Sequence, residues 1–501
     1  MTHKSDHTRP ILTSFAVAAA LALTALPASA FTPLVGPSDV DAHCGRESVD
    51  TVVASDTVST PNVIGPVTGG IRTQKPYGTT LEPLFNGYIE EEFFIGGTAT
   101  AIAGETAQYR TRIVVRRPID PTFFNGSVIF DWTNVTIPDD TDASWGPMQH
   151  MIMTRGYSYI SVSAQRLAVE ASPLALKQWD PVRYGSLNHP GDEFSYDIYS
   201  QAAEAALTAT AMGDLAPCIE RRLAIGASQS GSRMKTYINQ VHETAGVFDG
   251  FQPQIASPSG VDRNGAPVLW VNSMSETSDV DGTPADSENF RLWELAGPAH
   301  TTQEYSGYTN AQLVHAHSNG LVDSYNREEA NAWGYDQSPG ACVSRNRYQV
   351  KFAWSAALVA LDAWVRTGVA PEPMPRAARD VNGRMYDAHG NLLGGVRGPL
   401  LDVPIATYYG GDVPDGSGAC GQVGGRTPLT GLTQVFDSAT IAALYPTRQS
   451  YVSAFEAAVD DALAQGFMLP EGAQLLRSRL DLAADFVAAQ SAPSMTSRLV
   501  R

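Results

Sequence analysis

The sequence predicts an α/β fold, in which a mostly parallel central sheet carries helices on both faces. Two observations lead to this prediction. Between residues 91 and 300, β-rich stretches alternate with helical patterns, as they do in parallel sheets whose strands are joined by helices. Of the 501 residues, 43% are hydrophobic and only 17% are charged, which excludes a disordered or fibrous protein. The length allows several average domains, or one large domain with an appendage.

Strands are expected where β-branched and aromatic residues gather between turn residues. The expected strands are Glu91–Thr98, Tyr109–Arg116, Ser127–Asn134, Tyr157–Ser163, Arg221–Ala227, Phe248–Ile255, Pro267–Ser273 and Phe290–Ala296. Helices are expected where good helix formers gather or apolar residues recur with helical spacing. The expected helices are Trp145–Arg155, Phe194–Met212, Gln229–Val241 and Tyr348–Thr367. In such sheets the chemistry lies in loops at the carboxyl ends of the strands.

The part of the chain after residue 375 has a different character. Residues 376–426 are rich in glycine and loop-like, with a possible strand at Val403–Tyr409, and Phe455–Ala489 is helical in pattern. We therefore expect three segments: a signal peptide over residues 1–30, an α/β core over residues 31–375, and a loop-rich and helical C-terminal extension over residues 376–501 that packs on the core.

The N-terminus has the pattern of a secretory signal. Lys4 and Arg9 precede an apolar run, Ile11–Leu26, and small residues follow up to Ala30, after which we expect cleavage. An uncleaved membrane anchor is the alternative, but the run is short of the roughly 20 apolar residues that a span needs. With no later apolar stretch long enough to span a bilayer, the sequence predicts a secreted or periplasmic protein.

Charge and cysteine content narrow the possible partners. With 34 basic and 52 acidic residues the net charge is −18, which argues against nucleic acid as a partner. The four cysteines are Cys44, Cys218, Cys342 and Cys420, and an even number in an exported chain predicts two disulfides, whose pairing stays open. Because no two of them form a C-x-x-C pair, we expect neither a zinc ribbon nor a thioredoxin-type site.

The sharpest local signal is the string Gly226-Ala227-Ser228-Gln229-Ser230. It lies between an expected strand and an expected helix, which is the arrangement of a nucleophile elbow. The turn is so tight that it needs small residues two positions before and two after the serine, and Gly226 and Ser230 meet that need. The string alone also fits a glycine–serine loop without chemistry, and its context favours Ser228 as a nucleophile.

A serine nucleophile needs a base and an orienting acid, which follow it along the chain in an α/β-hydrolase. His300 comes directly after the strand Phe290–Ala296, whereas His315 and His317 follow no strand and suit structural roles better. The acid is expected after the strand Pro267–Ser273, where Glu276 is nearest to the strand end and Asp279 is a rival. Backbone N–H groups of Gln229 and of a residue near Asn134 are expected to bind the oxyanion.

Several longer strings make the chain resemble a bacterial alpha/beta hydrolase domain family whose elbow reads Gly-x-Ser-Gln-Ser-Gly. They are FDWTNV (130–135), DPVRYGSLNHPGDEFSYDIYSQA (180–202), LAIGASQSGSRMKTYIN (223–239) and FRLWELAGPAH (290–300). The resemblance implies an α/β-hydrolase fold and a serine esterase, with Ser228 as nucleophile and His300 as base. The family reads Glu-Thr-Asp after the strand, where this chain has one residue more, so Glu276 and Asp279 both remain candidates for the acid.

The sequence thus predicts an exported serine hydrolase that cleaves a small-molecule carboxylic ester through an acyl-enzyme, without metal or organic cofactor. A peptidase, an amidase or an acyltransferase on the same fold is one alternative, because fold and triad are shared among them. A secreted binding protein that has kept the fold without catalysis is another.

Overall fold

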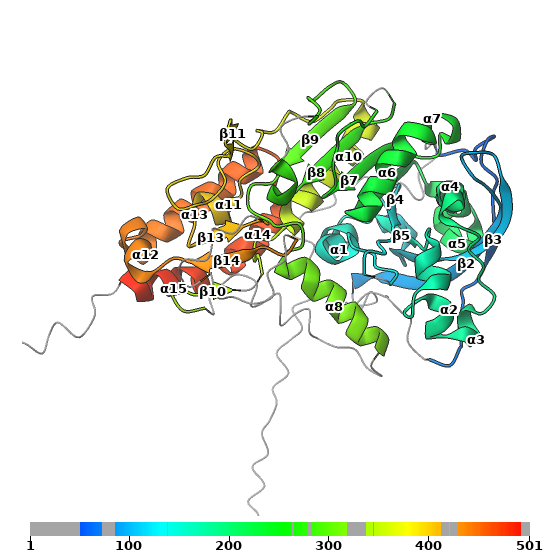
Figure 1. Ribbon diagram of the computed structural model, residues 1–501, viewed down its shortest axis with the longest axis horizontal. Helices are drawn as coiled ribbons and strands as arrows, with labels where there is room; N and C mark the ends of the chain where they lie inside the picture. Colours follow the sequence, from blue (N-terminus) through cyan, green and yellow to red (C-terminus); the bar gives the residue numbers. More distant parts are fainter. Residues whose placement is uncertain are drawn as a thin grey trace, which may run out of the picture. The chain divides into compact units, whose positions relative to one another are not determined.

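The computed structural model describes residues 51–72, 86–137, 139–262, 265–278, 282–317, 337–343, 345–411, 420 and 429–491, which all belong to one compact unit. The predicted signal peptide and Asp279 lie outside these ranges. Nine strands form the main sheet, in the order β1-β2-β3-β5-β4-β6-β7-β8-β9 (Figure 1). Their bounds are Asn62–Ile64 (β1), Tyr88–Thr100 (β2), Thr106–Pro118 (β3), Ser127–Trp132 (β4), Ser158–Val162 (β5), Arg221–Ala227 (β6), Gly250–Gln254 (β7), Val268–Asn272 (β8) and Phe290–Glu294 (β9).

The sheet is parallel where the predicted chemistry lies. All pairs from β5 through β4, β6, β7 and β8 to β9 are parallel, whereas β1, β2, β3 and β5 pair antiparallel. Every residue of β4 to β8 is buried, as expected of strands covered on both faces. In β8, Val268 and Trp270 belong to one hydrophobic cluster while Leu269 and Val271 belong to the other, because successive side chains point to opposite faces. The predicted fold class is confirmed.

Helices cover both faces of this sheet. The cluster on one face takes in α1 (Trp145–Thr154) and α10 (Lys351–Thr367), and the cluster on the other takes in α4 (Ser195–Ala205) and α6 (Gln229–Gln240). Helix α8 (Gln303–His317) packs against α1. The remaining helices of this part are short: α2 (Leu176–Trp179), α3 (Pro181–Tyr184), α5 (Ala209–Met212) and α7 (His242–Ala245).

The single helix expected over 194–212 is instead two helices, so that prediction is wrong in its length. Helix α4 ends at Ala205 and α5 begins at Ala209. Between them the Thr208 hydroxyl donates to the Ala205 carbonyl at 2.6 Å and accepts the Ala211 N–H at 3.4 Å. A threonine that caps a new helix start in this way offers the backbone an alternative to continuing the previous one.

The C-terminal part adds small sheets and a group of helices (Figure 1). A three-stranded antiparallel sheet has the order β10-β14-β13, and β11 and β12 form a separate pair. Side chains of α10 and of the last helices share one hydrophobic cluster, which contains both Trp354 and Val459. The bounds are Cys342–Val343 (β10), Arg379–Asp380 (β11), Gly383–Arg384 (β12), Pro399–Asp402 (α11), Ala406–Tyr409 (β13), Leu432–Val435 (β14), Ser438–Leu444 (α12), Arg448–Ala464 (α13), Pro470–Ser478 (α14) and Leu480–Ser491 (α15).

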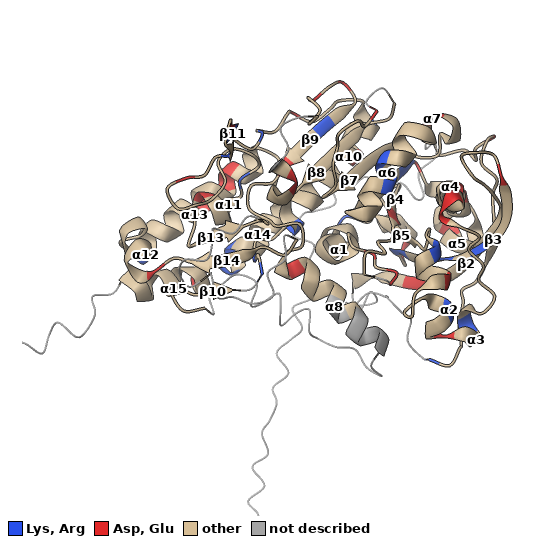
Figure 2. Cartoon of the chain, in the orientation of Figure 1, with Lys and Arg blue, Asp and Glu red and all other residues tan. Residues whose placement is uncertain are grey.

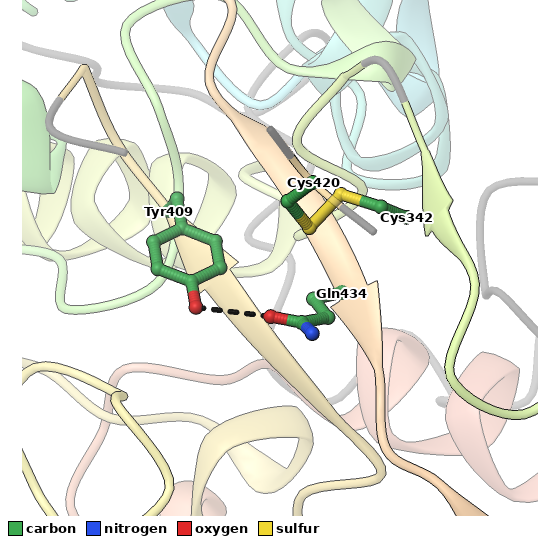
Figure 3. Close-up of a disulfide and its surroundings, with 4 residues drawn as sticks. All are labelled: Cys342, Tyr409, Cys420 and Gln434. Carbon is green, nitrogen blue, oxygen red and sulfur yellow. Dashed lines mark hydrogen bonds between the residues drawn. A yellow bond between two sulfur atoms is a disulfide. The ribbon is translucent and has the colours of Figure 1, made fainter. Parts of the chain in front are cut away.

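A disulfide joins Cys342 of β10 to Cys420, beside the hydrogen bond from the Tyr409 hydroxyl to Gln434 Oε1 at 3.1 Å (Figure 3). Cys218 is disulfide-bonded as well. Acidic and basic residues are interspersed along the described helices and strands (Figure 2). In the part of the chain that the structure describes, we find no helix with the length and hydropathy that a bilayer crossing requires.

Candidate active site

Ser228 occupies the turn between β6 and α6 with a backbone that side chains rarely adopt. Its φ is 61° and its ψ is −116°. Residues in such regions cost of order 1–3 kcal/mol and persist where the surrounding structure holds them. Backbone carbonyl oxygens approach this turn closely at two glycines, where a side chain would not fit. A Cβ on Gly226 would lie 2.9 Å from the Ser230 carbonyl oxygen, and one on Gly231 would lie 2.8 Å from the Gln254 carbonyl oxygen of β7.

Ser230 fills its small-residue position and also binds the strand before the turn. Its hydroxyl accepts the Ala227 N–H at 2.9 Å and donates to the Ala227 carbonyl at 2.8 Å. A glycine in this position would leave both backbone groups without that partner. Ser230, at the last position of the predicted elbow string, therefore stabilises the turn through two hydrogen bonds to Ala227. The sequence pattern did not indicate this role.

His300 bridges Ser228 and Glu276. Its Nε2 lies 2.9 Å from the Ser228 Oγ and its Nδ1 lies 2.6 Å from Glu276 Oε1. The His300 and Glu276 side chains are only 15% and 13% exposed, so both bonds are largely shielded from water. The three predicted residues come from three separate strand ends and meet at the same edge of the sheet. Asp279, the rival for the acid, lies outside the described residues.

The second carboxylate oxygen of Glu276 is bound by Ser273, the residue that follows β8. Oε2 accepts the Ser273 N–H at 3.0 Å and the Ser273 hydroxyl at 2.6 Å, so the carboxylate is fixed at the very end of β8. Glu276 lies in a short 3-10 helix, Met274–Ser278. The hydroxyl of Ser275, from the same helix, accepts the His300 N–H at 2.9 Å. This helix therefore positions both the ring and the backbone of the histidine.

Two arginines of the C-terminal part donate hydrogen bonds to the same 3-10 helix. Arg384 of β12 donates to the Ser275 carbonyl and to the Thr277 hydroxyl, each at 3.1 Å. Arg379 of β11 donates to the Thr277 carbonyl at 2.6 Å and forms an ion pair with Glu294 at the end of β9. No sequence signal identified these two residues, because they lie about 100 positions from the segment that they hold.

The backbone groups expected to bind the oxyanion differ in their availability. Gln229 is the first residue of α6, where an N–H has no acceptor within its own helix. The Asn134 N–H instead donates to the Thr141 carbonyl at 2.7 Å, so it is not free for a ligand. The Asn134 side chain donates to the Ala227 carbonyl at 2.7 Å and thereby ties its loop to the turn at Ser228. The second oxyanion donor, expected near Asn134, stays a prediction.

The loop that follows β4 contacts a cluster of buried charged side chains. Arg116 of β3 is fully buried and contacts Asp142 at 2.6 Å and Glu90 at 2.7 Å. Asp142 also accepts the Tyr308 hydroxyl at 3.1 Å and the Gln312 amide at 2.6 Å, both from α8. The helix that follows His300 is thus docked on the loop that follows β4.

Burial changes the acidity of the same loop. It raises the pKa of Asp142 and raises the pKa of Asp139 to about 7, because the charged form loses its hydration. The Asp139 carboxylate keeps one hydroxyl donor, Thr141, at 2.6 Å. Asp139 is only 1% exposed, so water does little to offset the cost of its charge.

Within the described ranges, no three His, Cys, Asp or Glu side chains are grouped so that they could hold a metal ion. The geometry of the site instead suits nucleophilic chemistry. A hydroxyl, an imidazole and a carboxylate in line can move one proton and stabilise the resulting imidazolium.

Comparison with known proteins identifies the family to which the chain belongs. The family model described as alpha/beta hydrolase domain matches residues 63–478. No curated protein matches the chain.

Solved structures resemble the chain only loosely. Oligopeptidase B from Trypanosoma brucei is 10% identical with a TM-score of 0.25, over 42% of this chain and 33% of that one. Esterase Est22 is 13% identical with a TM-score of 0.25, over 37% of this chain and 64% of that one. The rice cell wall degrading esterase LipA from Xanthomonas oryzae is 11% identical with a TM-score of 0.24, over 34% of this chain and 43% of that one. At such values the resemblance says nothing about substrates.

Proposed function

Because this chain belongs to the alpha/beta hydrolase domain family, we propose that it is a serine hydrolase that cleaves a small-molecule carboxylic ester. One observation carries the proposal: the Ser228 hydroxyl, the His300 ring and the Glu276 carboxylate stand in line at 2.9 and 2.6 Å. Distances of this size are those of a nucleophile, its base and the group that orients the base.

In the proposed mechanism the Ser228 Oγ attacks the ester carbonyl carbon while His300 Nε2 takes the hydroxyl proton. Glu276 accepts the Nδ1–H of His300, fixes that tautomer and stabilises the imidazolium. The tetrahedral oxyanion lies between the Gln229 N–H and a second backbone N–H near Asn134. His300 then gives its proton to the leaving alkoxide, which departs as the alcohol. Water, activated by His300, attacks the acyl-enzyme, releases the acid and restores the Ser228 hydroxyl.

We further propose that the protein works outside the cytoplasm. Two features support export: the N-terminal segment has the pattern of a signal peptide, and the described cysteines are disulfide-bonded. An oxidising compartment is where such bonds form and persist.

The test is Ser228→Ala, with Ser232→Ala as the matched control. Ser232 is an exposed serine one helical turn further along α6. We expect Ser228→Ala to lose at least about 10³-fold in turnover of a short p-nitrophenyl ester, and to lose covalent labelling by a fluorophosphonate. Ser232→Ala should keep both. Retained turnover by a folded Ser228→Ala protein would refute the proposal, and cleavage of a p-nitroanilide at a similar rate would move the activity from esters to amides.

A further inference from the structure

We infer that Asn346 is a positioning residue for His300, and that through it the C-terminal part of the chain takes part in aligning the catalytic base. The inference rests on the proposed function. Asn346 lies between β10 and α10, outside the three strand-end loops that supply Ser228, Glu276 and His300. Its side chain is fully buried, with 0% exposure, so each of its polar groups needs a partner within the protein.

Asn346 binds the histidine loop at two points that bracket His300. Its side-chain Nδ2 donates to the Gly297 carbonyl at 2.9 Å, three residues before the histidine. Its backbone carbonyl accepts the Gln303 N–H at 2.7 Å, three residues after the histidine. One residue thus fixes both ends of the segment that carries the base.

The same residue binds the β13–β14 sheet. Its Nδ2 also donates to the Tyr409 carbonyl at 3.0 Å, and its own N–H donates to the Thr430 carbonyl at 2.9 Å. The Asn346 Oδ1 accepts the Tyr348 N–H at 2.9 Å, which leaves the side-chain amide fully engaged. Asn346 therefore joins the histidine loop to Tyr409 and Thr430, which lie 63 and 84 positions further along the chain than Asn346.

Neighbouring contacts reinforce this junction. The Thr301 N–H, next to the histidine, donates to the Leu429 carbonyl at 2.8 Å. A Cβ on Gly297 would lie 2.3 Å from Tyr348, so the ring packs directly on the backbone of the histidine loop. These contacts leave the loop few alternative conformations while Asn346 is in place.

A positioning role has a specific kinetic consequence. Proton transfer needs heavy atoms within hydrogen-bond reach, and a displacement of about 1 Å can cost on the order of 10²-fold in rate. Asn346 is fully buried and therefore offers a substrate no surface to bind. Loss of the Asn346 amide should therefore lower kcat with little change in KM.

The chain offers a matched control in Asn391. It too is 0% exposed, donates from Nδ2 to a carbonyl, that of Ala406, at 3.0 Å, and accepts the Tyr408 N–H at 2.9 Å. None of its bonds reaches the histidine loop. Asn391→Ala therefore reproduces the loss of a buried amide without releasing His300.

The experiment compares Asn346→Ala and Asn391→Ala with wild type for stability by urea unfolding and for kcat and KM on a p-nitrophenyl ester, well below the unfolding transition. Both variants should lose stability. Asn346→Ala should lose about 10-fold or more in kcat with KM within about threefold, and Asn391→Ala should stay within about twofold in both. Should Asn346→Ala fail to fold, the isosteric pair Asn346→Asp and Asn391→Asp carries the same comparison.

Equal kcat values for the two alanine variants, beside an inactive Ser228→Ala, overturn the role of Asn346 and leave the proposed function standing. A larger rise in KM than fall in kcat for Asn346→Ala also overturns it, because that result places Asn346 in substrate binding. Retained turnover by Ser228→Ala overturns the proposed function and this inference together.

Discussion

At the scale of single residues, Glu276 combines two tasks in one carboxylate. Oε1 faces the His300 ring at 2.6 Å, and Oε2 takes both the N–H and the hydroxyl of Ser273. A carboxylate held on one oxygen keeps the other aimed at the ring without a further cost in side-chain entropy at each turnover. We propose that this fixed aim explains why an acid four residues past the end of β8 can orient the histidine.

Replacement of this carboxylate is the direct test. We expect Glu276→Gln to lower kcat by about 10⁴-fold, because an amide favours the wrong imidazole tautomer and leaves the imidazolium unpaired. Asp279→Asn is the control, since Asp279 competes with Glu276 on sequence grounds. The measurement is turnover of one p-nitrophenyl ester by both variants, with stability followed by thermal melting. A loss confined to Asp279→Asn would transfer the role of the acid to that residue.

At the scale of elements, the loop after β4 carries charge where the fold leaves little water. Asp139 and Asp142 are each 1% exposed, and Arg116 pairs with Asp142 but not with Asp139. The loop nevertheless has to stay in place, because it presents Asn134 to the turn at Ser228. Holding the loop in this position therefore costs free energy, because it keeps the charged form of Asp139 away from water.

The cost of burying this charge predicts that the stability of the protein depends on pH. Burial raises the pKa of Asp139 to about 7, so the folded protein holds this proton in a range where the unfolded chain, with an ordinary pKa near 4, has released it. The contribution of Asp139 is complete below about pH 4 and is lost as the pH rises to about 7. Asp139→Asn removes this loss, so we expect the variant to exceed wild type in free energy of unfolding by about 1–4 kcal/mol at pH 8.

Urea unfolding of wild type and Asp139→Asn at pH 4 and at pH 8 measures this difference. The gain of the variant should shrink towards zero at pH 4, where the carboxyl group is protonated in the folded state and already about half protonated in the unfolded chain. A gain of equal size at both pH values would assign the effect to packing and not to charge.

At the scale of the whole molecule, the Cys342–Cys420 disulfide links two segments of the C-terminal sheet region 78 residues apart in sequence. A cross-link of that span removes unfolded-state entropy worth roughly 4 kcal/mol in the chain-entropy model. We expect the double variant Cys342→Ala/Cys420→Ala to lose about 2–5 kcal/mol in free energy of unfolding by urea titration.

Thiol titration complements this measurement. Because Cys218, Cys342 and Cys420 are all disulfide-bonded, the unfolded, unreduced protein should contain no titratable thiol from these three residues. A stoichiometric thiol signal, or a double variant as stable as wild type, would contradict the stabilising role of the bond.

The sequence by itself determined the sheet and the places where chemistry is to be sought. Strand β6 has the predicted bounds, Arg221–Ala227, because a short buried run followed by small residues and a helical pattern has few other solutions. The places of Ser228, Glu276 and His300 after the ends of β6, β8 and β9 likewise follow from local pattern and from the geometry of parallel sheets.

Only the tertiary structure decided which groups meet. It brings Glu276 within 2.6 Å of the His300 ring, it commits the Asn134 N–H to Thr141, and it joins Arg384 and Asn346 to loops far away in sequence. Local pattern cannot show such contacts, because a hydrogen bond between residues from 7 to 109 positions apart depends on the path of the chain between them. Periodicity fixes which face of an element is buried, whereas the partner of each buried polar group is fixed only when all the elements are packed.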